Sequence, residues 1–404
     1  MKLLLIIAAI FLSLFSCSIH GQENKKEEKI ITGAARVNNY IPAIKGKRIG
    51  IISNHTSLVN GVHLVDTLLA LDMNVIKIFS PEHGFRGDVD AGASIGNYLD
   101  QKTGLPVISL YGKHHQPTGK DLENLDILIF DIQDVGVRFY TYLSTLHYVM
   151  ESCAKHDVPL LILDRPNPNG HYVDGQILDT IYRSFVGIHP VPVVYGLTIG
   201  EFAGMINGEK WLDNGRECNV SVIPCLNYTH DSLYQLPVNP SPNLPNMHSV
   251  YLYPSLGLFE GTVMSVGRGT GFPFQVFGHP AMLHVNFTFV PRSIPGKSTY
   301  PKHEGELCRG VNLMDIPLDS LKSLKKINPT WIIEAYRKTE VNDFFNSFFY
   351  NLSGTSELKA QIINDVPVDK IRLSWQEDIH QYMKTRNKYL LYPDFNKGVY
   401  LQEN

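Results

Sequence analysis

Short apolar runs alternate with longer amphipathic stretches through the first half of the chain. The apolar runs have the length of buried strands and cover residues 48–54, 74–79, 106–110, 126–130, 159–163 and 219–224. Three stretches between them have the apolar spacing of helices, at residues 62–71, 139–156 and 198–212. Because such alternation is typical of a sheet covered on both faces, we predict an α/β domain with a mostly parallel sheet.

The pattern changes at residues 236–245, where four prolines fall within ten residues. Proline lacks the amide donor, so this stretch is neither a helix nor a central strand. Helical spacing returns at residues 318–324, 356–363 and 368–388. We therefore predict a larger domain over residues 40–245 and a smaller α+β domain over residues 246–404.

The first residues have the pattern of an export signal. Lys2 precedes a short apolar run that ends at Phe15, and Ser16 comes directly before Cys17. The run is too short for a comfortable membrane span. It resembles a bacterial lipoprotein signal, in which Cys17 would carry the lipid.

We therefore predict a signal and the start of a tether over residues 1–21, and a flexible linker over residues 22–39. The protein would be exported and held in the cell envelope, in contact with a membrane only through the lipid at Cys17. Ordinary secretion, with cleavage near Gly21, is the alternative.

Composition narrows the range of partners. The 404-residue chain has 36 Lys and Arg against 39 Asp and Glu, a formal net charge of −3. Such a chain has no basic field for nucleic acid. Export permits disulfides, and Cys218 and Cys225 are a candidate pair across a hairpin. We expect none of the four cysteines after the signal to be catalytic, and their spacing is not that of a zinc site.

Polar side chains directly follow five of the predicted strands. They are Asn54 and His55; Glu82 and His83; residues 111–115; Asp131, Gln133 and Asp134; and Asp164, Arg165 and Asn167. In open α/β sheets, ligands bind beyond the carboxyl ends of the strands. This convergence predicts a site at one edge of the sheet.

The loop Ser80–Gly87 is the densest of these segments in reactive groups. It carries Glu82, His83 and Arg86, with a proline and two glycines that shape its backbone. Loops at strand ends are common mounts for catalytic groups. Glu82 is our leading catalytic candidate, although a Glu-His pair is also common at surfaces and helix caps.

The other acidic groups have structural alternatives. Asp134 and Arg138 have the spacing of a helix-terminal ion pair, and residues 164–168 have the composition of a stiff, salt-bridged turn. His55, His83 and the two aspartates of the fourth strand could be combined into a divalent site. We predict no bound metal.

Residues 267–271 contain three glycines. Their spacing is not that of a dinucleotide fingerprint, and they lack the strand before it and the helix after it that such a site needs. We therefore predict no nucleotide and no cofactor. Glycines on both sides of Arg268 would let its guanidinium approach an anionic group. Glu260 and Arg268 follow the domain boundary and are placed to project back into a cleft between the domains.

Several motifs together resemble those of the NamZ family. They are residues 80–87, 130–142, 164–168, 260–262 and 267–270. The resemblance implies a Rossmann-like domain without nucleotide, a smaller C-terminal domain and a site in the cleft between them. It also implies an exo-β-N-acetylmuramidase that releases N-acetylmuramic acid from the non-reducing end of peptidoglycan fragments, with Glu82 as the catalytic glutamate.

The chemistry of glycosidic cleavage assigns roles to these groups. A carboxylic acid must protonate the departing oxygen, which we assign to Glu82, with His83 or a neighbouring acidic group tuning its pKa. A second group must activate water or stabilise the anomeric centre: Asp131 is the first choice, Asp134 the second, and the substrate's own acetamido oxygen the alternative. The lactyl carboxylate of muramic acid would pair with an arginine, for which the candidates are Arg86, Arg138, Arg165 and Arg268.

The predicted binding set is completed by Asn54, His55, Gln133, Asp164, Asn167 and Glu260. Two other functions compete with the glycosidase. One is a non-catalytic lipoprotein that captures wall fragments in the same cleft. The other is a metal-dependent amidase or esterase of the wall.

Overall fold

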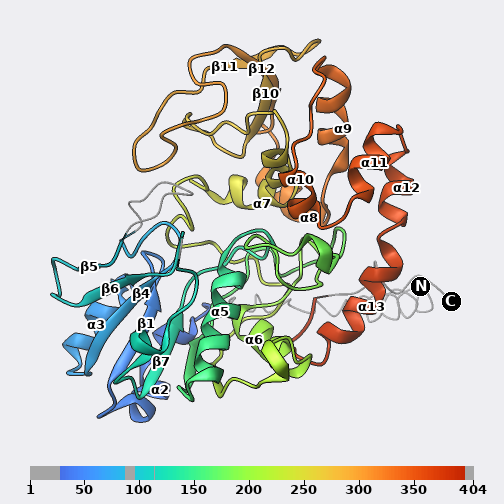
Figure 1. The fold of residues 1–404 in the computed structure, drawn as a ribbon. Coiled ribbons are helices and arrows are strands. Elements are labelled where there is room, and N and C mark those ends of the chain that lie inside the picture. Colours follow the sequence, from blue (N-terminus) through green and yellow to red (C-terminus); the bar gives the residue numbers. More distant parts are fainter. Residues whose placement is uncertain (1–27, 87–95, 113, 396–404) are drawn as a thin grey trace, which may run out of the picture.

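The computed structural model describes residues 28–86, 96–112 and 114–395. The predicted signal and the lipid-bearing Cys17 lie outside these residues. The first half of the chain forms the lower part of the molecule in Figure 1, and most of the second half forms the upper part. In the described part of the chain, no helix has both the length and the apolar character needed to cross a bilayer.

A seven-stranded sheet forms the centre of the first domain, as far as the described residues show, with the order β5-β6-β4-β1-β7-β8-β9. The strands are β1 (Ile49–Ser53), β4 (Val75–Ser80), β5 (Tyr98–Leu99), β6 (Pro106–Ser109), β7 (Ile127–Asp131), β8 (Leu160–Leu163) and β9 (Val220–Ile223). All neighbours are parallel except β5 and β6. Without the edge strand β5, this is the doubly wound order, whose direction of winding reverses between β1 and β7.

Helices cover both faces of this sheet. They are α2 (Val37–Ile44), α3 (Leu64–Ala70), α4 (Gly119–Leu122), α5 (Tyr142–Lys155) and α6 (Ile199–Gly208), and a small hairpin of β2 (Leu58–Val59) and β3 (Val62–His63) precedes α3. Successive strand residues point to opposite faces, so Ile51 packs with α2 and α3 while Ile52 belongs to the core with α5 and α6. The prediction of a mostly parallel α/β domain is confirmed.

The linker predicted over residues 22–39 is too long. Ile31 and Leu226 exchange two backbone hydrogen bonds, of 3.0 and 2.8 Å, which fix the chain beyond β9. Gly33 lies so close that a Cβ there would be 2.2 Å from the Ile223 carbonyl oxygen. The buried Tyr40 donates to the Ala34 carbonyl at 2.9 Å. Because small residues allow this close packing, the folded domain begins before residue 40.

The second domain begins at α7 (Met247–Leu256), directly after the proline-rich segment. A three-stranded antiparallel sheet follows, formed by β10 (Val276–His279), β11 (Phe287–Phe289) and β12 (Cys308–Asn312). The later helices are α8 (Leu318–Leu324), α9 (Pro329–Lys338), α10 (Phe348–Ser353), α11 (Glu357–Ile363), α12 (Val368–Leu373) and α13 (Gln376–Arg386). The smaller α+β domain is thus confirmed, but the helix predicted over 368–388 is interrupted at Ser374 and the buried Trp375.

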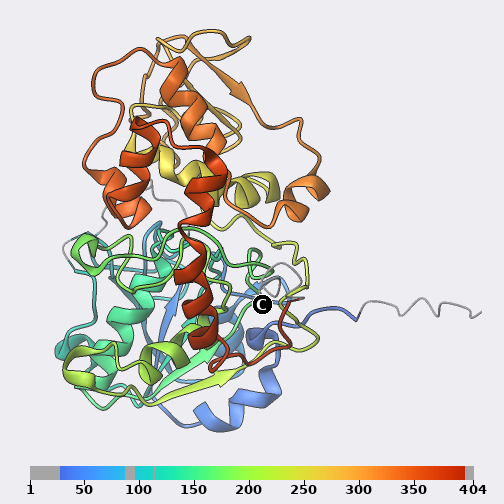
Figure 2. The ribbon, with the colours of Figure 1, turned by 90° about the vertical axis from the view of Figure 1, so that its right-hand side faces the viewer.

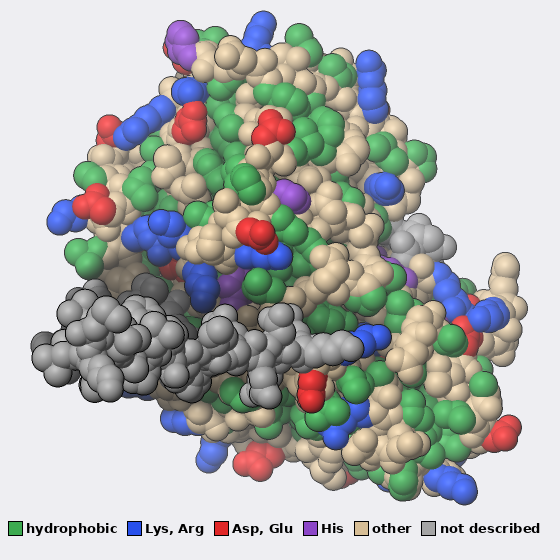
Figure 3. All heavy atoms as spheres, turned by 180° about the vertical axis from the view of Figure 1, so that it is seen from behind, with side chains coloured by type: hydrophobic (Ala, Val, Ile, Leu, Met, Phe, Trp, Pro, Cys, Tyr) green, Lys and Arg blue, Asp and Glu red, His purple; other side chains and the backbone are tan. Residues whose placement is uncertain are grey.

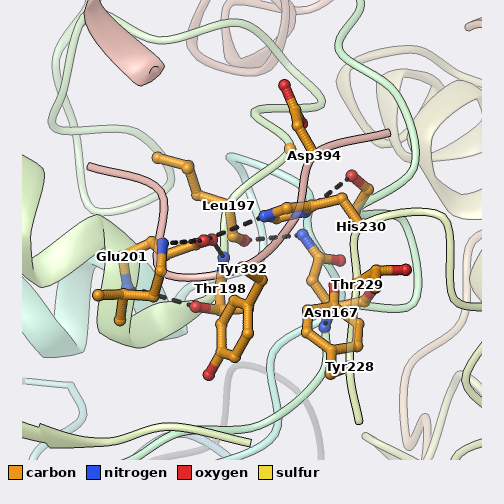
Figure 4. A network of polar contacts seen from close by, with 12 residues as sticks. Asn167, Leu197, Thr198, Glu201, Tyr228, Thr229, His230, Tyr392 and Asp394 are labelled. Atoms are coloured by element: carbon orange, nitrogen blue, oxygen red, sulfur yellow. Dashed lines mark hydrogen bonds and ion pairs between the residues drawn. The ribbon is translucent and has the colours of Figure 1, made fainter. Parts of the chain in front are cut away.

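The C-terminal segment returns to the first domain, which Figure 2 shows for α13. Tyr382 donates to the Tyr195 carbonyl at 2.7 Å. Beyond the helix, the Leu391 amide donates to the buried Glu201 carboxylate at 2.9 Å, and His230 lies 3.1 Å from the same oxygen (Figure 4). The prediction assigned the whole chain after residue 245 to the second domain. In the structure, the last turns of the chain pack on the first domain.

Acidic and basic side chains are interspersed over the face shown in Figure 3. This mixture agrees with the small net charge of −3.

Candidate active site

A cavity of about 720 Å³ lies between the two domains. From the first domain it is lined by Glu82, His83, Tyr111, residues 139–142 and residues 185–186. From the proline-rich segment and the second domain it is lined by Ser241, Asn243, Leu244, Tyr253, Glu260, Arg268, Phe274, residues 297–300 and Phe348. Nine of these side chains are aromatic. Their ring faces can stack against a sugar ring, and they make the surroundings of the charged groups on the wall less polar.

Glu82 is held at the cavity wall by two hydroxyl groups. Thr141, directly before α5, donates to Glu82 Oε2 at 2.7 Å. The Tyr111 hydroxyl, beyond the end of β6, is hydrogen-bonded to the same carboxylate. Burial and the charge of Glu82 raise the pKa of Tyr111 far above its usual range, so the phenol remains a donor. The carboxyl group is thereby oriented by two other segments of the first domain, one that follows β6 and one that precedes α5.

The loop that carries Glu82 has an uncommon backbone. His83 has φ +74°, in the left-handed region that non-glycine residues rarely adopt, and Gly84 follows with φ +78°. The Gly84 amide closes the turn on the Pro81 carbonyl at 3.2 Å. His83 is buried and lines the same cavity as Glu82. A local strain of this kind is typical of functional sites.

Glu260 and Arg268 form an ion pair on the opposite wall. Arg268 Nε and Nη2 donate to the two carboxylate oxygens of Glu260 at 2.7 and 3.1 Å. The guanidinium lies 5.0 Å from the centre of the Phe274 ring. Gly267 and Gly269, on either side of Arg268, both have positive φ. The structure therefore places this pair on the cleft, and its part in binding stays a prediction.

Asp131 is a correction to the sequence prediction. It is fully buried, and both of its carboxylate oxygens accept from Arg165, at 2.6 and 2.9 Å. Neither residue lines the cavity. Along β7, Asp131 is on the same face as Ile129, which packs with α2 and α3. We therefore assign Asp131 and Arg165 to a buried structural ion pair, rather than to proton transfer and carboxylate recognition.

Two further arginines also lie away from the cavity wall. Arg86 pairs with Asp100 at 2.8 Å and stacks on Phe85, with 4.3 Å between guanidinium carbon and ring centre. Arg138 is buried, and burial lowers its pKa to about 9, so it remains charged at neutral pH.

Arg138 donates to four backbone carbonyls. Two belong to the first domain, Gln176 and Val191, and two to the end of α10, Leu352 and Ser353. This arginine therefore fastens α10 to the first domain and does not read a substrate carboxylate.

The predicted amide and imidazole ligands support loops behind the wall. Asn54 donates to the hydroxyl of the cavity residue Tyr142 at 2.7 Å. His55 is bonded to the Asn239 carbonyl at 2.7 Å, Gln133 donates to Pro166 at 2.7 Å, and Asn167 donates to Leu197 at 2.8 Å. None of the four lines the cavity. Buried loop backbones need such partners, which explains why polar residues gather at these strand ends.

Asp134 and Asp164 are also buried behind the wall. Asp134 accepts hydrogen bonds from the Tyr195 hydroxyl and the Gly136 amide, yet burial raises its pKa to about 7. Asp164 accepts from Tyr392 at 2.6 Å and from Thr198 at 2.7 Å, and burial raises its pKa to about 6. These positions do not support a catalytic role for Asp134 or a binding role for Asp164.

The raised pKa of Asp134 has a consequence for stability. Since this carboxyl has an ordinary pKa near 3.8 and about 7 in the fold, the folded protein keeps a proton that the unfolded chain loses between these values. The unfolding free energy should therefore fall as the pH rises from 4 to 7. In Asp134→Asn this contribution is absent. The melting temperature of the variant minus that of wild type at the same pH should therefore increase steadily as the pH rises over that range. Thermal unfolding at stepped pH checks this, and a constant difference would contradict it.

Several cavity residues were missed by sequence reasoning. Tyr111 and Thr141 were inside segments we singled out, but nothing in the sequence distinguished their hydroxyls from neighbouring ones. Residues 297–300 carried no signal at all, since their place on the wall depends on how the second domain folds back over the first.

None of the four described cysteines forms a disulfide, although Cys153 and Cys218 are hydrogen-bonded to each other. Cys153, Cys218, Cys225 and Cys308 are all buried and all free. Cys218 lies two residues before β9 and Cys225 two residues after it, and the strand between them alone spans about 10 Å. A disulfide bridges Cα atoms less than about 7 Å apart. The candidate pair is therefore wrong, because the hairpin it required is a single strand.

Within residues 28–86, 96–112 and 114–395, no three His, Cys, Asp or Glu side chains gather in a way that would hold a metal ion.

Comparison with known proteins gives matches over almost the whole described chain. Two family models match, described as exo-β-N-acetylmuramidase NamZ, N-terminal, over residues 49–248, and exo-β-N-acetylmuramidase NamZ, C-terminal, over residues 251–392. The peptidoglycan β-N-acetylmuramidase NamZ of Bacillus subtilis (strain 168) is 38% identical over 393 residues, which covers 92% of this chain and 93% of that protein.

Two crystal structures of DUF1343 family proteins from Bacteroides fragilis NCTC 9343 are similar in fold. One has a TM-score of 0.84 and 50% identity, covering 91% of this chain and 99% of the other. The second has a TM-score of 0.76 and 30% identity, covering 90% and 99%. With this coverage, the similarity in fold extends over both domains.

Proposed function

The chain belongs to the NamZ family and is a glycosidase, and we propose from this premise that it releases N-acetylmuramic acid from the non-reducing end of peptidoglycan fragments. The observation that carries this proposal is the position of Glu82. It is a carboxyl group on the wall of an aromatic interdomain cavity, oriented by Thr141 and Tyr111. The cavity volume is in the range of small-ligand sites.

Cleavage begins with proton transfer from Glu82 to the glycosidic oxygen. The bond between the sugars breaks through a state with positive charge at the anomeric carbon, and the departing oxygen needs a proton as the bond lengthens. The donors on Glu82 come from Thr141 and Tyr111, which are neutral hydroxyls. They hold the carboxyl group in a fixed orientation at the cavity wall.

For the second role, we propose the acetamido oxygen of the substrate. Apart from Glu82, the carboxylate on the described cavity wall is that of Glu260, and both of its oxygens accept from Arg268. This pairing favours a neighbouring group on the sugar over a protein carboxylate for stabilising the anomeric centre. A substrate with a trifluoroacetamido group, whose oxygen is less basic, should then be cleaved more slowly.

The substrate preference tests the function directly. The protein should hydrolyse a chromogenic β-N-acetylmuramide and leave the matching β-N-acetylglucosaminide nearly untouched, because the two differ in the lactyl group that defines muramic acid. Release of the chromophore measures both rates under the same conditions. Equal rates would contradict muramic acid specificity. A rate abolished by a chelator and restored by a divalent metal would favour the metal-dependent hydrolase.

Export and a lipid anchor at Cys17 remain proposals that rest on the leader sequence. Labelling of the protein with a radioactive fatty acid in cells would test the anchor.

A further inference from the structure

Four Asp, Glu, Lys or Arg side chains line the described cavity wall: Glu82, Glu260, Arg268 and Lys297. Glu260 and Arg268 are joined through two hydrogen bonds and neutralise one another. Glu82 accepts a hydrogen bond from Thr141 and is hydrogen-bonded to Tyr111. Lys297 is the remaining charge, and in the described residues no carboxylate lies within ion-pair distance of its ammonium group.

The backbone of Lys297 has a defined position on this wall. Ile294 and Ser298 exchange two backbone hydrogen bonds, of 3.0 and 2.8 Å, and so close a tight turn around Lys297. Gly296 adopts φ +77° within that turn. At its base, the Arg292 amide donates to the Gly269 carbonyl at 2.9 Å, which ties the segment to the loop that carries Arg268.

A second attachment comes from the segment between the domains. The buried Asn243 donates from Nδ2 to the Lys297 carbonyl at 2.7 Å. The same segment is tied to the first domain, since Tyr140 donates to the Pro240 carbonyl at 2.8 Å. The lysine is therefore mounted on a fixed backbone, while its side chain is exposed. Such an ammonium group is available to a ligand anion without first breaking an internal ion pair.

We propose that Lys297 is the specificity-determining residue of this cavity, and that its ammonium group pairs with the lactyl carboxylate of N-acetylmuramic acid. The inference rests on the proposed function for the identity of the anion. It replaces the predicted arginines: Arg86, Arg138 and Arg165 lie off the wall, and Arg268 is occupied by Glu260. A lysine can serve here because its three donors on one point charge require no planar partner geometry.

Tyr300 extends this part of the wall. Its side chain lines the cavity and is 91% exposed. An aromatic ring is seldom left this exposed by the rest of a folded chain. It follows Lys297 by three residues, so an apolar face and a positive charge occur on the same short segment. A sugar that carries a carboxylate presents the complementary pair of features, an apolar ring face and an anion.

The test compares Lys297→Met with Arg292→Met. Both remove one positive charge from the same loop, but the exposed Arg292 does not line the cavity. For the chromogenic muramide, Lys297→Met should lower kcat/KM by about 10- to 100-fold, mainly through KM, as expected for loss of a charged hydrogen bond. The low rate on the glucosaminide should not change. Arg292→Met should have the kcat/KM of wild type. Lys297→Arg keeps a positive charge, so its kcat/KM for the muramide should lie between those of wild type and Lys297→Met.

Binding of the free sugars separates this inference from the proposed function. Calorimetric titration of wild type should give tighter binding of N-acetylmuramic acid than of N-acetylglucosamine, and Lys297→Met should abolish the difference. Wild type that cleaves neither substrate but shows this pattern would refute the hydrolase and support the lysine. If Lys297→Met keeps the binding preference, or loses both substrates equally with unchanged folding, the role of Lys297 is refuted.

Discussion

Glu82→Gln should lose about 10²- to 10⁴-fold in turnover of the muramide substrate, the contribution typical of a positioned general acid. The amide has nearly the shape of the carboxyl group and can still accept the hydrogen bond from Thr141, which wild type makes at 2.7 Å. It cannot donate a proton to the glycosidic oxygen. Substrate affinity should therefore change little while kcat falls. Steady-state kinetics and calorimetric binding on the same preparation measure the two effects.

Glu123→Gln is the matched control for this variant. Glu123 is exposed at the end of α4 and does not line the cavity, so its substitution should leave kcat unaltered. The pair also distinguishes the glycosidase from a non-catalytic binder of wall fragments. A binder would show no turnover in wild type and the same affinity in both variants. Full activity in Glu82→Gln would exclude Glu82 as the acid.

Asp131→Ala should destabilise the protein by about 3–5 kcal/mol, the range for breaking a buried ion pair on one side. Arg165 would keep its charge at a fully buried position, with the Leu58 carbonyl, 3.1 Å from Nη2, as its remaining hydrogen-bond partner among the described contacts. The folded fraction should retain its kcat, because neither residue lines the cavity. Denaturant unfolding monitored beside kinetics gives both quantities.

The double variant Asp131→Leu with Arg165→Met keeps this prediction testable if the single variant does not fold. It removes both charges from the buried site, so it should be more stable than Asp131→Ala alone. Its kcat should be close to that of wild type. A double variant that folds as wild type but loses turnover by two orders of magnitude would restore Asp131 to the mechanism and contradict its structural assignment.

Much of the fold could be predicted from the sequence because its elements obey local rules. The runs at Ile49–Ser53, Val75–Ser80 and Ile127–Asp131 are almost wholly apolar, as strands buried on both faces must be. The edge strand β5 escaped prediction, since two residues carry no periodic pattern. The start of the domain was placed too late, because the contact of Gly33 with Ile223 depends on a strand nearly two hundred residues away.

The sequence alone determined the architecture, the family and the loop that bears Glu82, since strand patterns and a compact motif are local properties of a chain. Only the tertiary structure decided which charged side chains reach the cavity. Adjacent residues of a strand face opposite sides of its sheet, so Asp131 is turned toward Arg165 and away from the cleft. Lys297 reaches the wall because its carbonyl accepts from Asn243 and the Arg292 amide donates to the Gly269 carbonyl, which together hold the turn there. Contacts between segments so far apart leave no local pattern in the chain.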